Sequence, residues 1–106
     1  MVKKYNKLIR DNIPIICEKN GSKAKTVTLS KEEYMKYLKE KLKEETEEYL
    51  ESEEAEELAD ILEVVEALAK VKNVSFEDLL KIKEEKANRN GKFEKRLLLI
   101  EVETKE

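Results

Sequence analysis

Residues 44–60 read EETEEYLESEEAEELAD and carry two acidic pairs, Glu45 with Glu48 and Glu57 with Asp60. The members of each pair are three residues apart, so in a helix both carboxylates lie on one face. Like charges stacked this way cost a helix about 0.2–0.5 kcal/mol per pair. The span between the pairs is short enough to turn the chain back directly. The stretch therefore predicts two neighbouring helices that point four carboxylates at one gap.

The whole chain predicts a mainly α fold in a single domain, residues 1–106. Its length suits one domain, and its low content of glycine (2) and proline (1) beside 44% charged residues favours long helices with short connections. Ser30 and Glu33 have the spacing of a capping box at a helix start. The predicted helices run from about Pro14 to Asn20-Gly21, from Ser30 to about Ser52, from about Glu54 to Lys72, and from Ser75 to about Asn90-Gly91.

Two segments outside these helices predict a small β element. Residues 24–29 alternate polar and apolar side chains, and residues 97–103 read LLLIEVE. We expect the two segments to pair as a minor two-stranded β element beside an all-α helical bundle.

The second predicted helix carries an acid on its apolar face. Its apolar stripe is Tyr34, Leu38, Leu42 and Tyr49, and Glu45 falls on the same stripe. The third predicted helix is apolar nearly all the way round, so we expect it to be buried on two sides. Because a chain of 106 residues can hardly surround such a helix, we expect a homodimer or a homotetramer.

The four paired acids, Glu45, Glu48, Glu57 and Asp60, match the carboxylate ligands that Mg²⁺ prefers. An unpaired carboxylate buried on an apolar face is destabilising, and a bound cation removes that problem. A cation there could orient a triphosphate and lower the pKa of a bound water. Since the chain has no histidine, an acid such as Glu44 or Glu48 could serve as general base.

Each acid taken alone has a simpler interpretation as a solvated or ion-paired surface group, because glutamate is a good helix former. The paired acids differ, because they lie on or beside apolar stripes and Asp60 is a poor helix former with no capping role there. The acids expected at the surface are Glu47, Glu51, Glu53, Glu54, Glu63 and Glu66.

Basic residues form two further clusters, with two interpretations left open. Lys86 and Arg89 lie one turn apart near a helix C-terminus, where cations offset the helix dipole. The same pair could equally clamp phosphate oxygens. Lys7 and Arg10 form a similar cluster beside Asp11, and this cluster alone is weak evidence of phosphate binding.

Charge, hydropathy and cysteine content exclude several other classes. The net charge of −3 gives no nucleic-acid footprint. No apolar run of about 18 residues and no signal-peptide pattern occur, so we expect a cytoplasmic protein with no membrane partner. Cys17 is the single cysteine and has no histidine to activate it, so we expect an inert core residue.

Four blocks of the chain resemble a known family, the all-α nucleoside triphosphate pyrophosphatases of MazG-like type, related to phosphoribosyl-ATP pyrophosphohydrolase. The acid pattern EExxE followed by ExxD is the central match. The blocks occur in the family's order and cover almost the whole chain. They read KLIRDNIP (7–14), KLKEETEEYL (41–50), EELADILEVVEAL (56–68) and EKANRNGKFEKRLLL (85–99).

The resemblance implies hydrolysis of a nucleotide between its α and β phosphates, giving a monophosphate and pyrophosphate. It implies Mg²⁺, or Mn²⁺ in its place, on Glu45, Glu48, Glu57 and Asp60. Glu44 and Glu45 are the catalytic acids in this comparison. The resemblance assigns phosphate binding to Lys86 and Arg89 and to Lys7 and Arg10. The family also implies homodimers or homotetramers with the active site close to a subunit interface.

Two alternatives stay open from the sequence. Phosphoribosyl-ATP hydrolysis in histidine synthesis shares the acid motif, and a non-catalytic helical interaction module could keep the fold without activity.

The chain also departs from the family pattern. The gap between Glu48 and Glu57 is shorter than in many members, and Asn90-Gly91-Lys92-Phe93 stands where a glycine pair often precedes the aromatic residue.

Overall fold

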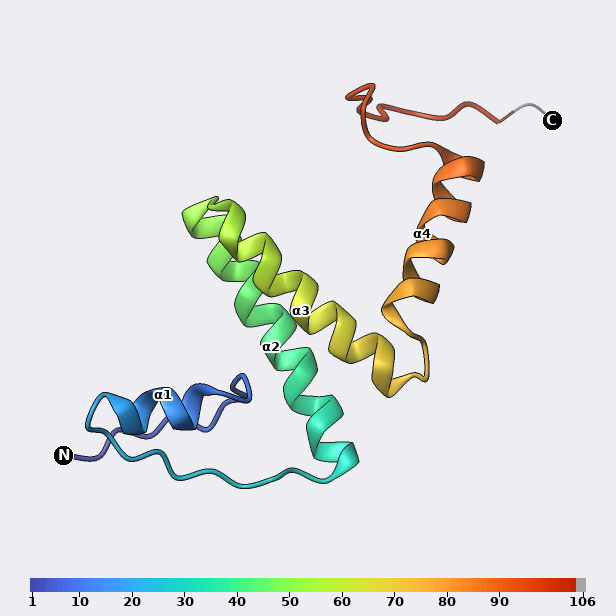
Figure 1. Cartoon of the computed structure of the whole chain (residues 1–106). Coiled ribbons are helices and arrows are strands. Elements are labelled where there is room, and N and C mark those ends of the chain that lie inside the picture. The colour runs from blue at the N-terminus through green and yellow to red at the C-terminus, as the bar shows by residue number, and fades with distance from the viewer. Residues whose placement is uncertain (105–106) are drawn as a thin grey trace.

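The computed structural model describes residues 1–104 and contains four helices in that range (Figure 1). The antiparallel pair α2 and α3 forms the centre of the molecule, and the mainly α prediction is confirmed. The helices are α1 (Ile13–Lys19), α2 (Lys31–Ser52), α3 (Ala55–Val71) and α4 (Phe76–Asn90).

The start and the end of α2 follow directly from its sequence. The Ser30 hydroxyl accepts a hydrogen bond from the Glu33 N–H at 3.2 Å, and the Glu33 carboxylate accepts one from the Ser30 N–H at 3.4 Å. This is the predicted capping box. The helix ends at Glu53, whose positive φ of 57° turns the chain out of the helix. Only Glu53 and Glu54 separate α2 from α3, so the tight joint holds the two acidic motifs side by side.

The last helix is placed by a second turn and cap. Val74 N–H donates to the carbonyl of Ala69 at 2.9 Å, and the Ser75 hydroxyl caps α4 by accepting from Asp78 N–H at 3.0 Å. Within the described residues α4 packs against α3 and not against α2. Figure 1 shows α4 diverging from the α2–α3 pair as it runs toward the C-terminal segment.

The core of a single chain is small. Among the described residues, Leu38, Val64 and Ala69 are its buried apolar side chains, and Glu45 is the one buried charged residue. The radius of gyration is 19.0 Å, whereas a compact domain of this length has about 13 Å. On α3, Leu58 and Leu62 are 45% and 54% exposed, so one chain does not bury this helix on two sides.

The predicted two-stranded β element is wrong for the described residues. Residues 24–29 and 97–103 both form irregular chain, and no strand occurs in residues 1–104. The first segment leads from α1 into α2, while the second follows α4 at the opposite end of the molecule (Figure 1). Their local patterns suit strands, but the course of the helices keeps them apart, so no ladder forms.

Cys17 lies on the short helix α1 and is partly exposed, so it is not the enclosed core residue that was expected. Among the described residues, each helix is too short or too polar to span a bilayer.

Candidate metal centre

Three of the four predicted metal ligands meet between α2 and α3. Glu45 comes from α2, and Glu57 and Asp60 come from α3. Each offers a carboxylate oxygen, and these three oxygens lie within 4.8 Å of one another. We call these three residues the acid cluster. Its carboxylates come from two helices joined by a two-residue turn, so the α2–α3 pair itself fixes their spacing.

Glu45 is the most confined member of the acid cluster. Only 8% of the residue is exposed, and its Oε2 atom has no hydrogen-bond partner within residues 1–104. The other oxygen, Oε1, lies 3.6 Å from Nζ of Lys41. A buried carboxylate oxygen without a partner is strongly unfavourable. The chemistry of this oxygen would therefore suit a cation or a proton as its partner.

The electrostatics of Glu45 agree with that geometry. Burial raises the pKa of its carboxyl above the ordinary value, and the neighbouring carboxylate of Glu48 raises this pKa further by favouring the protonated form and by like-charge repulsion. Asp60 adds repulsion, and the Lys41 ammonium opposes the rise. Negative charge is therefore concentrated at the acid cluster, and the neighbouring side chains do not fully neutralise it.

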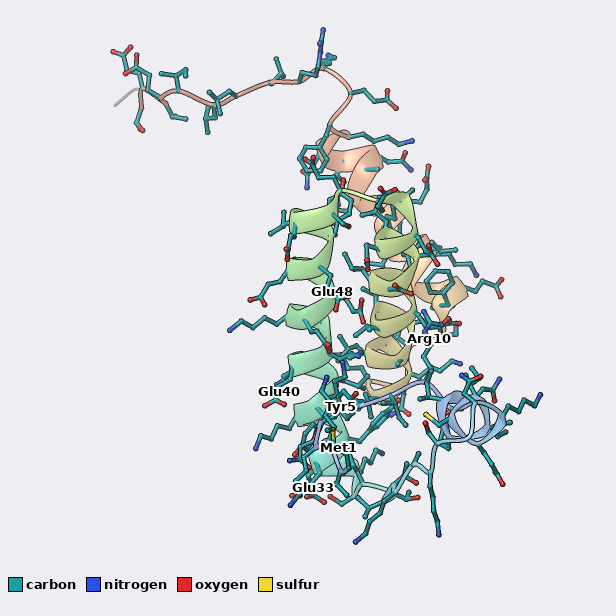
Figure 2. The ribbon with its side chains drawn as sticks, turned by 90° about the vertical axis from the view of Figure 1, so that its left-hand side faces the viewer. Met1, Tyr5, Arg10, Glu33, Glu40 and Glu48 are labelled. Atoms are coloured by element: carbon teal, nitrogen blue, oxygen red, sulfur yellow. The ribbon has the colours of Figure 1, made fainter. Side chains whose placement is uncertain are left out.

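Glu57, on α3, is affected by the same concentration of negative charge. Desolvation, followed by repulsion from Glu48 and Asp60, raises the pKa of Glu57. Glu48 itself is exposed and lies outside the group of three oxygens, but its charge acts on both Glu45 and Glu57. In Figure 2 it lies beside the gap between the two helices. The fourth predicted ligand is therefore a neighbour of the acid cluster in this structure.

Glu44 belongs to a different environment from Glu45. Its carboxylate accepts ion pairs at 3.0 Å from Lys7 and at 3.0 Å from Lys41. Burial favours the neutral acid, but these two ammonium groups outweigh it and hold the pKa of Glu44 below its ordinary value. The hydrogen bond to Glu44 in turn raises the pKa of Lys7. Glu44 is therefore an ionised carboxylate beside the acid cluster, and its charge is balanced by Lys7 and Lys41.

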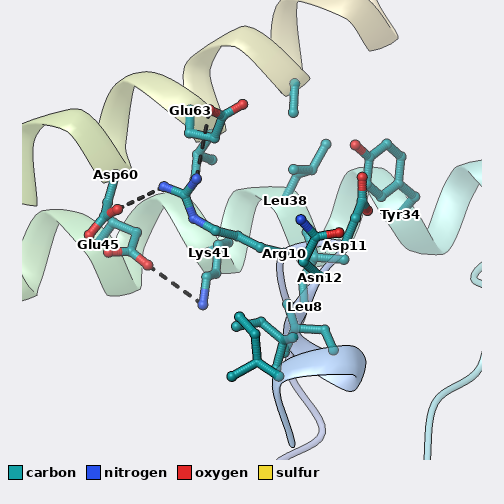
Figure 3. A pocket seen from close by; sticks show the side chains of 15 residues that line it. Leu8, Arg10, Asp11, Asn12, Tyr34, Leu38, Lys41, Glu45, Asp60 and Glu63 are labelled. Atoms are coloured by element: carbon teal, nitrogen blue, oxygen red, sulfur yellow. Dashed lines mark hydrogen bonds and ion pairs between the residues drawn. The ribbon is translucent and has the colours of Figure 1, made fainter. Parts of the chain in front are cut away.

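The N-terminal segment, residues 1–12, brings a second cation to the acid cluster. Nη2 of Arg10 donates to Oδ1 of Asp60 at 2.7 Å, and Nη1 lies 3.7 Å from Glu63 (Figure 3). Lys7 and Arg10, which the sequence offered as one basic cluster, thus contact different helices, Lys7 an acid of α2 and Arg10 two acids of α3. Lys41 completes this set of cations. Lys41 was not predicted as a site residue, although its spacing of three and four residues to Glu44 and Glu45 places all three side chains on one helix face.

A cavity of about 610 Å³ opens beside the acid cluster (Figure 3). One wall comes from the N-terminal segment and α1, and the other comes from α2 and α3. Glu45 and Asp60 lie at one end, while Leu38 and Val64 supply an apolar floor. Small-molecule sites in proteins have about 300–1,000 Å³ of space, so this cavity has the size of a ligand site.

The second predicted basic pair lies elsewhere. Lys86 and Arg89 are exposed residues in the C-terminal half of α4, which runs away from the acid cluster. Neither makes an ion pair within residues 1–104. In one chain they do not join the candidate site.

Comparisons with protein-family models, with curated proteins and with solved structures each gave no match.

Proposed function

We propose that this chain is a Mg²⁺-dependent nucleotide pyrophosphohydrolase of the MazG-like type, which cleaves a nucleoside triphosphate between its α and β phosphates. One observation carries the proposal. Three carboxylates converge from two helices, and the most buried of them, Glu45, has an unpartnered oxygen beside a ligand-sized cavity. The four sequence blocks that resemble the family support the same function.

The carboxylate set suits a hard divalent cation. Glu45, Glu57 and Asp60 would hold Mg²⁺, or Mn²⁺ in its place, with Glu48 next to them. When bound, the ion would neutralise the crowded negative charge and make water a better nucleophile at neutral pH. Glu44 is the proposed proton acceptor: its contacts with Lys7 and Lys41 keep it ionised but lower its pKa, so it becomes an effective base only when these ammonium groups turn to phosphate oxygens.

The basic residues around the acid cluster would bind the phosphates. Lys7 and Arg10 neutralise acids in the free protein and could turn to phosphate oxygens when a metal replaces them at those acids. Lys86 and Arg89 lie on α4, away from the acid cluster of their own chain. They remain proposed phosphate-binding residues that a neighbouring subunit would supply.

A homodimer or homotetramer is part of this proposal. A folded monomer of 12.5 kDa exposes about 6,200 Å², whereas this chain exposes 10376 Å². The excess of about 4,000 Å² is far more than the roughly 800 Å² that each partner buries in a standard interface. The exposed apolar face of α3, with Leu58 and Leu62, is the surface we propose for this contact.

The decisive experiment measures pyrophosphate release. Purified protein is incubated with ribo- and deoxyribonucleoside triphosphates and with phosphoribosyl-ATP, each with Mg²⁺ or with chelator. We expect Mg²⁺-dependent formation of pyrophosphate and a monophosphate, lost in Glu45→Gln and Asp60→Asn and kept in the matched surface variant Glu47→Gln. Intact turnover in Glu45→Gln or Asp60→Asn refutes the ligand assignment. No release from any substrate by folded protein favours the non-catalytic interaction module.

A further inference from the structure

The cavity beside the acid cluster has two chemically different ends. Tyr34, Leu38, Lys41 and Glu45 all line it, and they follow each other on α2 at spacings of four, three and four residues, which is one helix face. From Tyr34 to Glu45 the helix rises roughly 16 Å. The cavity thus runs from a charged end through an apolar floor to an aromatic end. Figure 3 shows Tyr34 and Asp11 on the side away from Asp60.

The N-terminal segment adds polar groups at the aromatic end. Asn12 and Asp11 line the cavity there, near Tyr34 (Figure 3). Asparagine at the residue before a helix normally caps it through its side chain. Asn12 occupies that position before α1, but its side chain makes no capping hydrogen bond and its backbone is already helical, with φ −90° and ψ −2°. Asn12 is exposed, so its amide is free to exchange solvent for a ligand.

The carboxylate of Asp11 is likewise uncommitted. Within residues 1–104 it takes part in neither a side-chain hydrogen bond nor an ion pair, unlike its neighbour Arg10. A planar aromatic face, an amide that can donate and accept, and a carboxylate that accepts are therefore gathered at one end of the cavity. The apolar floor separates them from the acid cluster.

We propose that Tyr34, Asn12 and Asp11 form the binding site for the base of a nucleotide whose phosphates lie at the acid cluster. This inference rests on the proposed function and adds the subsite that selects the substrate. The Tyr34 ring would stack on the base, and Asn12 would bond its polar edge. Asp11, an acceptor, favours bases with an exocyclic amino group, which are adenine, guanine and cytosine, over uracil and thymine.

The test separates base binding from phosphate binding by using two probes with Mn²⁺ present. Calorimetry gives the affinity of the protein for nucleoside monophosphates and for inorganic tripolyphosphate, which has no base. Stacking of one base supplies enough binding energy that Tyr34→Leu should weaken monophosphate binding about fivefold or more. Tripolyphosphate binding should stay within about twofold, because its contacts are electrostatic.

Three further variants serve as controls and extend this test. Tyr37→Leu removes another half-buried tyrosine of α2 that does not line the cavity, so it should leave both affinities unchanged. Tyr34→Phe keeps the aromatic ring and should retain monophosphate binding, even if the leucine variant is poorly folded. Asp11→Asn should reduce the preference for amino-bearing bases.

The outcomes distinguish this inference from the proposed function. If Mn²⁺ and tripolyphosphate bind but monophosphates bind no tighter, or Tyr34→Leu behaves like Tyr37→Leu, the base site is refuted and the metal centre stands. If monophosphates bind in a Tyr34-dependent way without Mn²⁺ binding, the base site stands and the metal centre is refuted. If no probe binds, both are overturned.

Discussion

Nη2 of Arg10 lies 2.7 Å from Oδ1 of Asp60, so a cation of the N-terminal segment contacts a carboxylate of α3 that we propose as a metal ligand. Lys7 does the same at Glu44, at 3.0 Å. In the ligand-free protein, Arg10 and Lys7 partly neutralise the negative charge of Asp60 and Glu44. A metal ion must therefore compete with Arg10 for Asp60, while a phosphate-bearing ligand gains a guanidinium that is already in place.

That competition predicts opposite effects of Arg10→Gln on two ligands. Both partners are partly exposed, with 55% and 33% of their side chains accessible, so the ion pair contributes at most about 1 kcal/mol. We expect Mn²⁺ to bind up to about fivefold more tightly in the variant, while tripolyphosphate in the presence of Mn²⁺ binds more weakly. Electron paramagnetic resonance of free Mn²⁺ and calorimetry measure the two.

Lys19→Gln is the control for this experiment, because Lys19 is an exposed cation of α1 that makes no ion pair within the described residues. It should change neither affinity. If Arg10→Gln weakens Mn²⁺ binding, Arg10 supports the metal site instead of competing for it, and its proposed role is wrong.

The Glu45 carboxylate should destabilise the metal-free protein. Its Oε2 is buried without a partner, and Glu48 and Asp60 repel its charge. Glu45→Gln keeps the shape and removes the charge, so with chelator present we expect a free energy of unfolding higher by about 1 kcal/mol. Urea unfolding followed by circular dichroism measures this difference, and Mn²⁺ binding should be lost in the same variant.

The comparison variant is Glu47→Gln, an exposed acid of α2 outside the acid cluster. Its stability should stay within a few tenths of a kcal/mol of the wild type. If the Glu45→Gln protein is much less stable than the wild type, the carboxylate has a structural partner, and Glu45 is not available as a metal ligand.

Stability and metal binding should depend on pH in opposite directions. The pKa values of Glu45 and Glu57 are raised above 4.5 in the folded chain, so the folded state holds more protons than the unfolded state just above that pH. Their contribution to stability is complete below pH 4.5 and is lost as the pH rises through the raised values. Glu44 acts in the opposite sense, because its lowered pKa gives stability that is lost on acidification.

Glu45→Gln separates these contributions. In chelator, the variant should lose part of the decline in stability that the wild type shows as the pH rises above 4.5. Over the same range, wild-type Mn²⁺ affinity should increase, because the metal displaces protons from its ligands. Urea titrations at several pH values and Mn²⁺ titrations measure both trends. A metal affinity that is independent of pH here would argue against these acids as ligands.

The helices and the acid cluster were predictable because their signals are local. Ser30 with Glu33 and Ser75 with Asp78 mark helix starts, and each is confirmed as a side-chain cap. Glu45 was recognisable because it lies on the same stripe as Leu38, the most buried side chain of α2. Patterns of three and four residues report which side chains share a helix face, and they indicated the three members of the acid cluster together with Glu48, which lies outside it.

The features that were missed depend on contacts between distant segments. The ion pair of Arg10 with Asp60 joins residues 50 positions apart, and no spacing rule predicts it. The β pairing failed for the converse reason. Residues 24–29 and 97–103 have strand-like patterns, but a strand needs a partner, and the helices lead the two segments to opposite ends of the molecule. Lys86 and Arg89 stay apart from the acid cluster because α4 begins beyond the C-terminal end of α3, whereas Glu57 and Asp60 lie in the first two turns of α3.

The exposed face of α3 leads to a prediction about assembly. Leu62 is 54% exposed one turn after Leu58, which is 45% exposed, and the chain exposes much more area than a compact monomer of its mass. We expect the wild type to sediment at two or four times 12.5 kDa. Leu62→Glu places a charge in the proposed contact and should shift the protein toward monomer and lower its melting temperature, since the contact stabilises the fold. Val27→Glu, at an exposed apolar residue outside the helices, should change neither quantity. A wild type that sediments as a monomer at micromolar concentration, or a Leu62→Glu protein of unchanged mass, would show that this face of α3 is not a subunit contact.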